Sequence, residues 1–283
     1  MELFKKEEAV ITTADVSAAI ENIAPVGLQE AWDNCGIMVG FKDNPVKKIL
    51  TCLEINEAIL NEAKELDVDM IITHHPLIFG GIKSLCTCNY KDRIIMELIR
   101  SGISVYSCHT PFDKVKGGNN DVIAEKLGLV SVKNLNGKDV ASASKMMERM
   151  DEADIGRIGE FSKSMLLKDV IKLVADNLGL SMRQIRVTGD LNTEISKVGM
   201  CTGAGSDLMG MAVGQGCQLF VTGDVKYHEA QTALEEGICV IDAGHYGTEK
   251  FFGEEMKAKL HKELGKNVEI IASSVNIDPF EII

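Results

Sequence analysis

The feature of this sequence that most constrains its fold is an alternation of apolar strands and amphipathic helices that occurs twice along the chain. Short links between such elements are typical of a largely parallel sheet with helices on both faces. The first run is predicted as strand 48–53, a helix capped by Asn56, strand 68–72, helix 92–100 and strand 103–108. The second run is predicted as strand 195–201, helix 208–213, strand 217–221, helix 229–236 and strand 238–241. Helices at 14–23 and 167–178, a short strand before Gly40 and a strand at 183–187 complete the pattern.

The two runs match each other at a constant separation of 149 residues. Four identities share it without a gap: Lys48 and Lys197, Cys52 and Cys201, Ala63 and Ala212, and Thr73 and Thr222. Any two strand–helix–strand units look partly alike, but the matched identities favour an internal duplication. The helix starting near Tyr246 and the strand 268–273 need a sheet to complete. We therefore predict two related α/β domains with mixed sheets flanked by helices, the first from residues 1–130 and 243–283 and the second from 131–242.

Composition excludes several classes of protein. The chain has 283 residues, 45% of them hydrophobic, and 30 Lys and Arg against 42 Asp and Glu, which gives a net charge of −12. An acidic chain without a basic run is a poor non-specific nucleic-acid binder, so small ligands, cationic ligands or metals are the expected partners. No segment approaches the about 20 apolar residues of a membrane-spanning helix. Residues 1–8 also lack the apolar core of a signal peptide, so we expect a cytoplasmic protein.

The eight cysteines are interpreted mainly as buried thiols of a reducing compartment. Cys86 and Cys88 form the only close pair, and a single CxC is weak evidence for a metal or redox role.

Histidine positions point to a metal site. Of six histidines, four follow predicted strands: His74 and His75 after one, His109 after the next, and His245 after the last. Asp113 lies four residues beyond His109, and Glu249 four beyond His245. Because ligands of open α/β sheets bind at the carboxyl ends of the strands, these side chains are candidate metal ligands.

The spacing indicates two ions rather than one. Adjacent residues that leave an extended strand point in opposite directions, so His74 and His75 suit two neighbouring ions. A helix starting at His245 places Glu249 on the same face, where its carboxylate can bridge both ions. Imidazole and carboxylate ligands without Cys suit Zn, Mn, Fe, Co or Ni. Water held between two such ions is acidic enough to be hydroxide near neutral pH, the nucleophile of two-metal hydrolases.

Two further histidines are candidates for proton transfer. His109 can be a ligand, a support for a ligand or a general base, and we favour an acid–base role. His228 either faces the same cavity as Lys226 or lies on the surface at the start of a helix. The glycine-rich segment 202–207 fits neither phosphate-loop pattern and is interpreted as a tight turn, with anion binding as the alternative.

These motifs resemble the family of GTP cyclohydrolase 1 type 2 homologues, also called the Ngg-interacting-factor-like family. The matching segments are Trp32–Gly40, Ile72–Phe79, His109–Asp113, Gly156–Gly159, Thr222–His228 and Gly244–Glu249. The resemblance implies a two-domain α/β protein with a dinuclear metal site in the cleft between the domains. It also implies a ring-shaped homohexamer, a trimer of dimers. By position, the implied ligands are His74, His75, Asp113, His245 and Glu249, with Glu249 bridging.

Two functions follow as hypotheses. The first is a metal-dependent hydrolase, in which His109 or His228 moves protons. Few basic residues accompany the motifs, Lys226 and the glycine turn being the only candidates for holding a triphosphate, which argues against GTP itself as the substrate. The second is a non-catalytic metal-binding regulator or scaffold that acts through protein partners.

Overall fold

The computed structural model describes residues 10–148, 150 and 154–283. Residues 1–8, on which the prediction about a signal peptide rests, lie outside that part. The chain divides into two compact units. The first unit contains residues 1–26, 32–109 and 253–277, and the second contains 27–31, 110–252 and 278–283.

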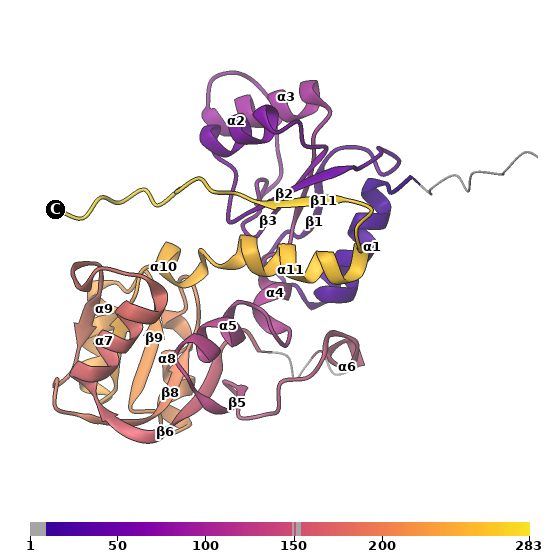
Figure 1. Ribbon diagram of the computed structural model, residues 1–283. Coiled ribbons are helices and arrows are strands. Elements are labelled where there is room, and N and C mark those ends of the chain that lie inside the picture. Colours follow the sequence, from indigo (N-terminus) through magenta and orange to yellow (C-terminus); the bar gives the residue numbers. More distant parts are fainter. Residues whose placement is uncertain (1–9, 149, 151–153) are drawn as a thin grey trace, which may run out of the picture. The chain divides into compact units, whose positions relative to one another are not determined.

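The first unit is a five-stranded sheet with the order β1-β4-β3-β2-β11. Its strands are β1 (Gly36–Val39), β2 (Lys48–Cys52), β3 (Met70–Thr73), β4 (Ser104–Ser107) and β11 (Glu269–Ala272). β1 is antiparallel to β4, and the other neighbours are parallel. Its helices are α1 (Thr13–Ile23), α2 (Glu57–Glu65), α3 (Tyr90–Ser101) and α11 (Phe252–Leu264) (Figure 1). The sheet is therefore mixed, as predicted.

Local signals explain the helix ends of this unit. Thr12 and Asp15 form a capping box at α1, in which Asp15 N–H donates to Thr12 Oγ1 at 3.3 Å. Asn56 Oδ1 accepts from the N–H of Ile59 at the start of α2. α3 ends at Gly102, whose φ of 70° is the left-handed conformation that glycine adopts without strain. α2 and α3 pack their apolar faces on the residues of β2, β3 and β4 that point to one side of the sheet.

The second unit is a six-stranded sheet with the order β5-β6-β8-β9-β10-β7. Its strands are β5 (Val130–Asn134), β6 (Arg157–Leu166), β7 (Arg186–Thr188), β8 (Glu194–Met200), β9 (Leu219–Thr222) and β10 (Cys239–Asp242). Its helices are α4 (Thr110–Lys114), α5 (Asn119–Lys126), α6 (Ala143–Glu148), α7 (Leu167–Leu178), α8 (Met209–Gly214), α9 (Tyr227–Glu235) and α10 (His245–Glu249). Short 3-10 turns occur at Val26–Leu28, Met182–Gln184 and Ser206–Leu208. α5 and α7 contribute to one apolar core, and α8 and α9 to another.

The alternation predicted for both runs is confirmed, as β2-α2-β3-α3-β4 and β8-α8-β9-α9-β10. The two runs also share a topology. The order β4-β3-β2 is parallel with antiparallel β1 beside β4, and β10-β9-β8 is parallel with antiparallel β7 beside β10. Strands β5 and β6 are not foreseen by the pattern. The alternation of β6 is obscured by Arg157, a charged residue that is fully buried.

The boundaries of the units differ from the sequence prediction. They fall after residues 109 and 252 instead of 130 and 242. The reason is packing, because Ile123 and Ala124 of α5 and Leu127 at its C-terminal end enter the core of the second sheet, and β5 pairs with β6. The closing strand β11 pairs in parallel with β2 of the first sheet.

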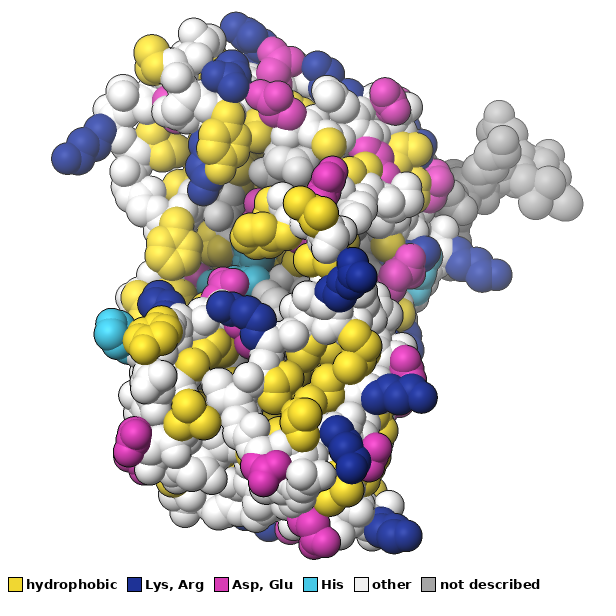
Figure 2. Space-filling view, turned by 90° about the vertical axis from the view of Figure 1, so that its left-hand side faces the viewer, with side chains coloured by type: hydrophobic (Ala, Val, Ile, Leu, Met, Phe, Trp, Pro, Cys, Tyr) yellow, Lys and Arg dark blue, Asp and Glu magenta, His cyan; other side chains and the backbone are white. Residues whose placement is uncertain are grey.

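Surface and thiol chemistry agree with an acidic globular protein. On the face in Figure 2, Lys and Arg side chains are interspersed with Asp and Glu, so this face has no continuous basic surface. Within the described residues, no helix combines the length and apolar character needed to cross a membrane. Five of the cysteines are buried, whereas Cys35 and Cys86 are partly exposed and Cys88 is exposed.

Candidate metal centre

Three histidines gather at the carboxyl edge of the first sheet. His74 and His75 directly follow β3, and His109 lies two residues beyond the neighbouring parallel strand β4. One ring nitrogen of each lies within 4.8 Å of the others. The ring centroids are 5.0 Å apart for His74 and His109 and 5.6 Å apart for His75 and His109. We call these three residues the histidine cluster.

Each ring of the histidine cluster is oriented by an oxygen acceptor at Nδ1. The acceptors are the Cys108 carbonyl for His74 at 3.1 Å, Glu54 Oε2 for His75 at 3.1 Å, and Asp33 Oδ1 for His109 at 2.9 Å. Carbonyl and carboxylate oxygens only accept, so Nδ1 carries the proton in the neutral ring and the lone pair is on Nε2. Histidines that bind metal through Nε2 typically have this support.

The relative directions of His74 and His75 differ from the sequence expectation. That expectation assumes an extended strand, but β3 ends at Thr73 and the chain bends at once. The N–H groups of both histidines donate to the carbonyl of Leu53, at 3.1 and 2.9 Å. Their ring centroids are consequently only 5.1 Å apart. The prediction of opposite directions is therefore wrong, because the backbone is no longer extended.

The second unit brings together Asp113, His245 and Glu249, which we call the acidic cluster. His245 and Glu249 are the first and last residues of α10, and the one-turn spacing places Nε2 of His245 3.0 Å from Oε2 of Glu249. A carboxylate oxygen of Asp113, on α4, lies within 4.8 Å of one of Glu249. Both carboxyl groups are buried. The sequence prediction that His245 and Glu249 share a helix face is confirmed.

Hydrogen bonds hold the acidic cluster in place. Asp224 Oδ2 lies 2.8 Å from His245 Nδ1, and Nε2 of the same ring faces the Glu249 carboxylate. Asp224 has a φ of 56°, a conformation that is uncommon for a residue other than glycine. Asn119 Nδ2 donates to Asp113 Oδ1 at 2.9 Å. The supports of all four rings therefore match the arrangement expected around a metal.

The glycine-rich turn after β8 forms a wall of the acidic cluster. The N–H of Gly203 donates to Thr248 Oγ1 at 2.9 Å, and the N–H of Gly205 donates to Thr222 Oγ1 at 3.0 Å. These donors are used within the protein, which supports the tight-turn interpretation over anion binding. At Gly203, φ is 65°, and a β-carbon there would collide with the Glu249 carboxylate.

Electrostatics favour a cation at the acidic cluster. Burial, followed by the negative charges of Asp113 and Glu249, raises the pKa of the neighbouring Cys201 thiol well above its usual range. Two buried carboxylates so close together repel each other unless a proton or a metal ion compensates their charge. Thr202 Oγ1, one residue before Gly203, is buried without a hydrogen-bond partner, which leaves it available to a metal-bound ligand. The residues present therefore fit a divalent metal bound by imidazole nitrogen and carboxylate oxygen.

Three candidate residues, His228, Cys86 and Cys88, belong to neither cluster. His228 is exposed on the first turn of α9, with its ring centroid 5.3 Å from that of Tyr227. The groups of potential metal ligands in the described part of the chain do not include His228, Cys86 or Cys88. Cys86 and Cys88 lie between β3 and α3, and the neighbouring Cys86 thiol raises the pKa of the Cys88 thiol.

Sequence reasoning did not single out the three acidic residues that orient the rings. Glu54 and Asp224 each lie two residues beyond a strand, β2 and β9, at the same sheet edges as the histidines. An acidic residue at the carboxyl end of a strand beside a histidine-bearing strand is the signal that identifies them. Asp33 lies in a loop before β1, and its partner His109 is 76 residues away in the sequence.

Comparison with known proteins places these features in a family. The family model described as Duf34/NIF3 (NGG1p interacting factor 3) matches residues 11–279. A Clostridium perfringens protein named GTP cyclohydrolase 1 type 2 homolog is 38% identical over 95% of this chain and 98% of its own length. A second relative of that name, from Clostridium acetobutylicum, is 34% identical over 94% of this chain and 97% of its own length.

Two solved structures have the same fold. The structure of a Bacillus cereus protein related to NIF3 has a TM-score of 0.88 at 23% identity and covers 98% of this chain and 100% of its own. That of a Staphylococcus aureus hypothetical protein has a TM-score of 0.85 at 28% identity and covers 97% of this chain and 100% of its own.

Proposed function

The chain belongs to the Duf34/NIF3 family, and on that premise we propose that it is a metal-dependent hydrolase with a dinuclear centre. The proposed ligands are His74, His75, Asp113, His245 and Glu249, with Glu249 as the bridge. The observation that supports this proposal is the oxygen at Nδ1 of every ring in both clusters, because such a contact orients a ring to bind metal through Nε2.

Chain connectivity supports the joint action of the two clusters. His109 and Asp113 are four residues apart. A segment of that length spans at most about 14 Å even when fully extended. The chain therefore runs from His109 of the histidine cluster to Asp113 of the acidic cluster within four residues.

Each remaining site residue has a proposed task. Divalent ions, when bound, supply Lewis acidity and lower the pKa of water. His109 accepts and returns the proton of the attacking water, because Asp33 fixes its ring and leaves Nε2 as the basic nitrogen. His228 is the second candidate for proton transfer, to a leaving group. The proposed substrate is a small molecule with an electrophilic carbon or phosphorus, and the proposed location of the protein is the cytoplasm.

Assembly and origin complete the proposal. A cavity of about 350 Å³ in the first unit is lined mainly by apolar residues of β1, α3 and the loop after β3, and Phe41 and Ile99 are exposed beside it. Exposed apolar surface of this kind supports association, and we propose a homohexamer built as a trimer of dimers.

The shared topology of the two runs supports an internal duplication.

The same apolar surface favours a second candidate function. A non-catalytic regulator or scaffold would bind metals for stability and present this surface to protein partners.

A substrate panel tests the proposed function. Protein reconstituted with Zn, Mn, Fe, Co or Ni is assayed on GTP, phosphodiesters and cyclic amides. Glu249→Ala is compared with Glu235→Ala, a matched change at an exposed position of α9. We expect turnover that Glu249→Ala abolishes and Glu235→Ala retains. Metal-loaded protein without turnover on any substrate would favour the scaffold.

A further inference from the structure

Cys86 and Cys88 form a pair of accessible thiols on segment 76–89, which joins His75 of the histidine cluster to α3. Cys88 is exposed and Cys86 is partly exposed, whereas five of the other six cysteines are buried. Thiol reactions of a folded protein require access for the reagent. This pair is therefore a place where a small molecule reaches two thiols that are close together in the chain.

The backbone around the pair fits the span of a disulfide. Thr87 and Cys88 lie in a turn directly before Asn89, the N-cap of α3. Residues two apart span at most about 7 Å even in an extended chain, and a turn shortens that span. A disulfide needs Cα atoms about 4.4–6.8 Å apart. The side chains are also close, because the Cys86 thiol raises the pKa of the Cys88 thiol.

Hydrogen bonds to the first turn of α3 hold this turn in place. Asp92 Oδ2 accepts from the N–H of Cys86 at 3.2 Å and from Asn89 Nδ2 at 2.8 Å. Asn89 Oδ1 accepts from the N–H of Asp92 at 2.9 Å, and Arg93 Nη1 donates to the Thr87 carbonyl at 3.4 Å. None of these four bonds involves a sulfur atom. Joining the two sulfurs therefore requires rotation of the cysteine side chains and leaves these contacts intact.

Two thiols alone suit oxidation better than metal binding. Within the described residues, the groups of three or more side chains that could share a metal ion include neither Cys86 nor Cys88. A structural zinc site takes four ligands, whereas a disulfide needs only the two thiols. In a reducing compartment, disulfides are usually transient and serve catalysis or redox sensing.

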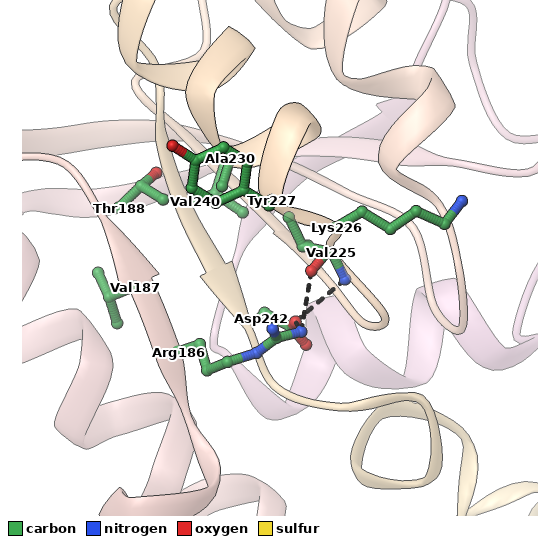
Figure 3. A pocket seen from close by; sticks show the side chains of 9 residues that line it. All are labelled: Arg186, Val187, Thr188, Val225, Lys226, Tyr227, Ala230, Val240 and Asp242. Carbon is green, nitrogen blue, oxygen red and sulfur yellow. Dashed lines mark hydrogen bonds and ion pairs between the residues drawn. The ribbon is translucent and has the colours of Figure 1, made fainter.

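The cavity between β7, β10 and α9 in the second unit offers no comparable chemistry. Figure 3 shows that Arg186 contacts Asp242 and the Val225 carbonyl and that Lys226 points away from the cavity. Lys226 pairs with Glu229 at 3.5 Å. The charged groups of this cavity are therefore paired within the protein, and its lining includes no cysteine.

We propose that Cys86 and Cys88 form a reversible dithiol–disulfide site that reacts with small disulfides such as oxidised glutathione. The Cys88 thiol loses its proton to water, and the thiolate attacks one sulfur of the small disulfide, whose S–S bond breaks to release one small thiolate. The Cys86 thiol then also loses its proton to water, and its thiolate attacks the Cys88 sulfur and releases the second small thiolate. Cys86 and Cys88 lose two electrons, which reduce the small disulfide to two thiols. The site uses none of the proposed metal ligands, so it does not depend on the proposed function.

Tryptic digestion separates the pair from the other cysteines. Cleavage after Lys83 and Lys91 releases residues 84–91, which contain Cys86, Cys88 and no further cysteine. Reduced full-length protein is incubated with millimolar oxidised glutathione and EDTA, quenched with acid, alkylated, digested and measured by mass spectrometry. We expect this peptide to lose two hydrogens and to take up no alkyl group. Treatment with dithiothreitol before alkylation should restore two alkylated thiols.

The internal disulfide should exceed the mixed disulfides with glutathione by about tenfold, because the second thiol lies two residues from the first and reacts within the same molecule. Cys88→Ser should carry glutathione on Cys86 instead of an internal bond. Its melting temperature should be unchanged, because the replaced side chain is exposed. Cys35→Ser is the matched control, since Cys35 is partly exposed and lies outside the peptide, and it should close the pair to the same extent as the unchanged protein.

Two results would overturn the proposal. Two free thiols in the peptide after the incubation would show that small disulfides do not oxidise the pair. Glutathione on both Cys86 and Cys88 of the same peptide would show that the two sulfurs do not join.

Discussion

Replacement of Gly203 by alanine is expected to damage the acidic cluster selectively. Gly203 has a φ of 65°, and its β-carbon would overlap Glu249 Oε1 and lie 3.2 Å from His245 Nε2. Gly237 is a matched position, because its φ is 73° and a β-carbon there meets nothing within 4 Å. The pair Gly203→Ala and Gly237→Ala therefore separates backbone strain from displacement of the cluster.

The expected losses of stability come from backbone strain in both variants and from displacement of the acidic cluster in Gly203→Ala. Alanine in the left-handed conformation costs about 1–2 kcal/mol, which both variants lose. Gly203→Ala must also move Glu249 and His245, and overpacking of this kind costs about 1–3 kcal/mol more. In domains of comparable size each kcal/mol lowers the melting temperature by about 2–4 °C. Displacement of metal ligands should lower metal affinity by about 10–100-fold in Gly203→Ala alone, as changes to ligand supports do.

Chelator competition with Zn or Mn measures the affinity, and calorimetry measures the melting temperature. We expect Gly237→Ala to melt a few degrees lower with unchanged metal affinity, and Gly203→Ala to lose both stability and affinity. Equal metal affinity in the two variants would show that Glu249 and His245 are not ligands, and would refute the reasoning.

Two further substitutions and one chemical modification test other parts of the structure. Asp224→Asn removes the carboxylate that orients His245 and should lower metal affinity about 10–100-fold in the same competition assay; an unchanged affinity contradicts its supporting role. Arg157→Lys keeps the charge but cannot reach Asp121 and the Lys114 carbonyl together, so it should lose about 3 kcal/mol or more in urea unfolding; a loss below about 1 kcal/mol contradicts this. Burial and nearby carboxylates raise the pKa of Cys201, so its thiol stays protonated at pH 8. Iodoacetamide should therefore leave buried Cys201 unmodified and react with exposed Cys88, and peptide mass spectrometry measures both. Alkylation of Cys201 in folded protein as fast as Cys88 would refute the buried thiol.

The elements that sequence predicts well are those fixed by local interactions. The capping box of Thr12 and Asp15 starts α1, and the αL glycine at position 102 ends α3. The i, i+4 spacing of His245 and Glu249 likewise needs only a helix to bring the two side chains together. In these cases the physical cause and the sequence signal lie within a few residues of each other.

The features that sequence misses depend on contacts between distant residues. Arg157 makes β6 appear polar, yet it is buried because Asp121 and the Lys114 carbonyl receive its hydrogen bonds. The bend after β3 is set by the Leu53 carbonyl, which binds both following N–H groups. The unit boundary moves from residue 130 to 109 because α5 packs on the second sheet, a choice that periodicity alone does not record.

The metal content of the purified chain tests the central claim most directly. Protein is reconstituted with Zn or Mn, freed of loosely bound ions, and analysed by elemental mass spectrometry against protein concentration. The dinuclear centre predicts two ions per chain in the unchanged protein and a clear loss in Glu249→Ala, with no loss in Glu235→Ala. Well under one ion per chain in the unchanged protein would contradict it.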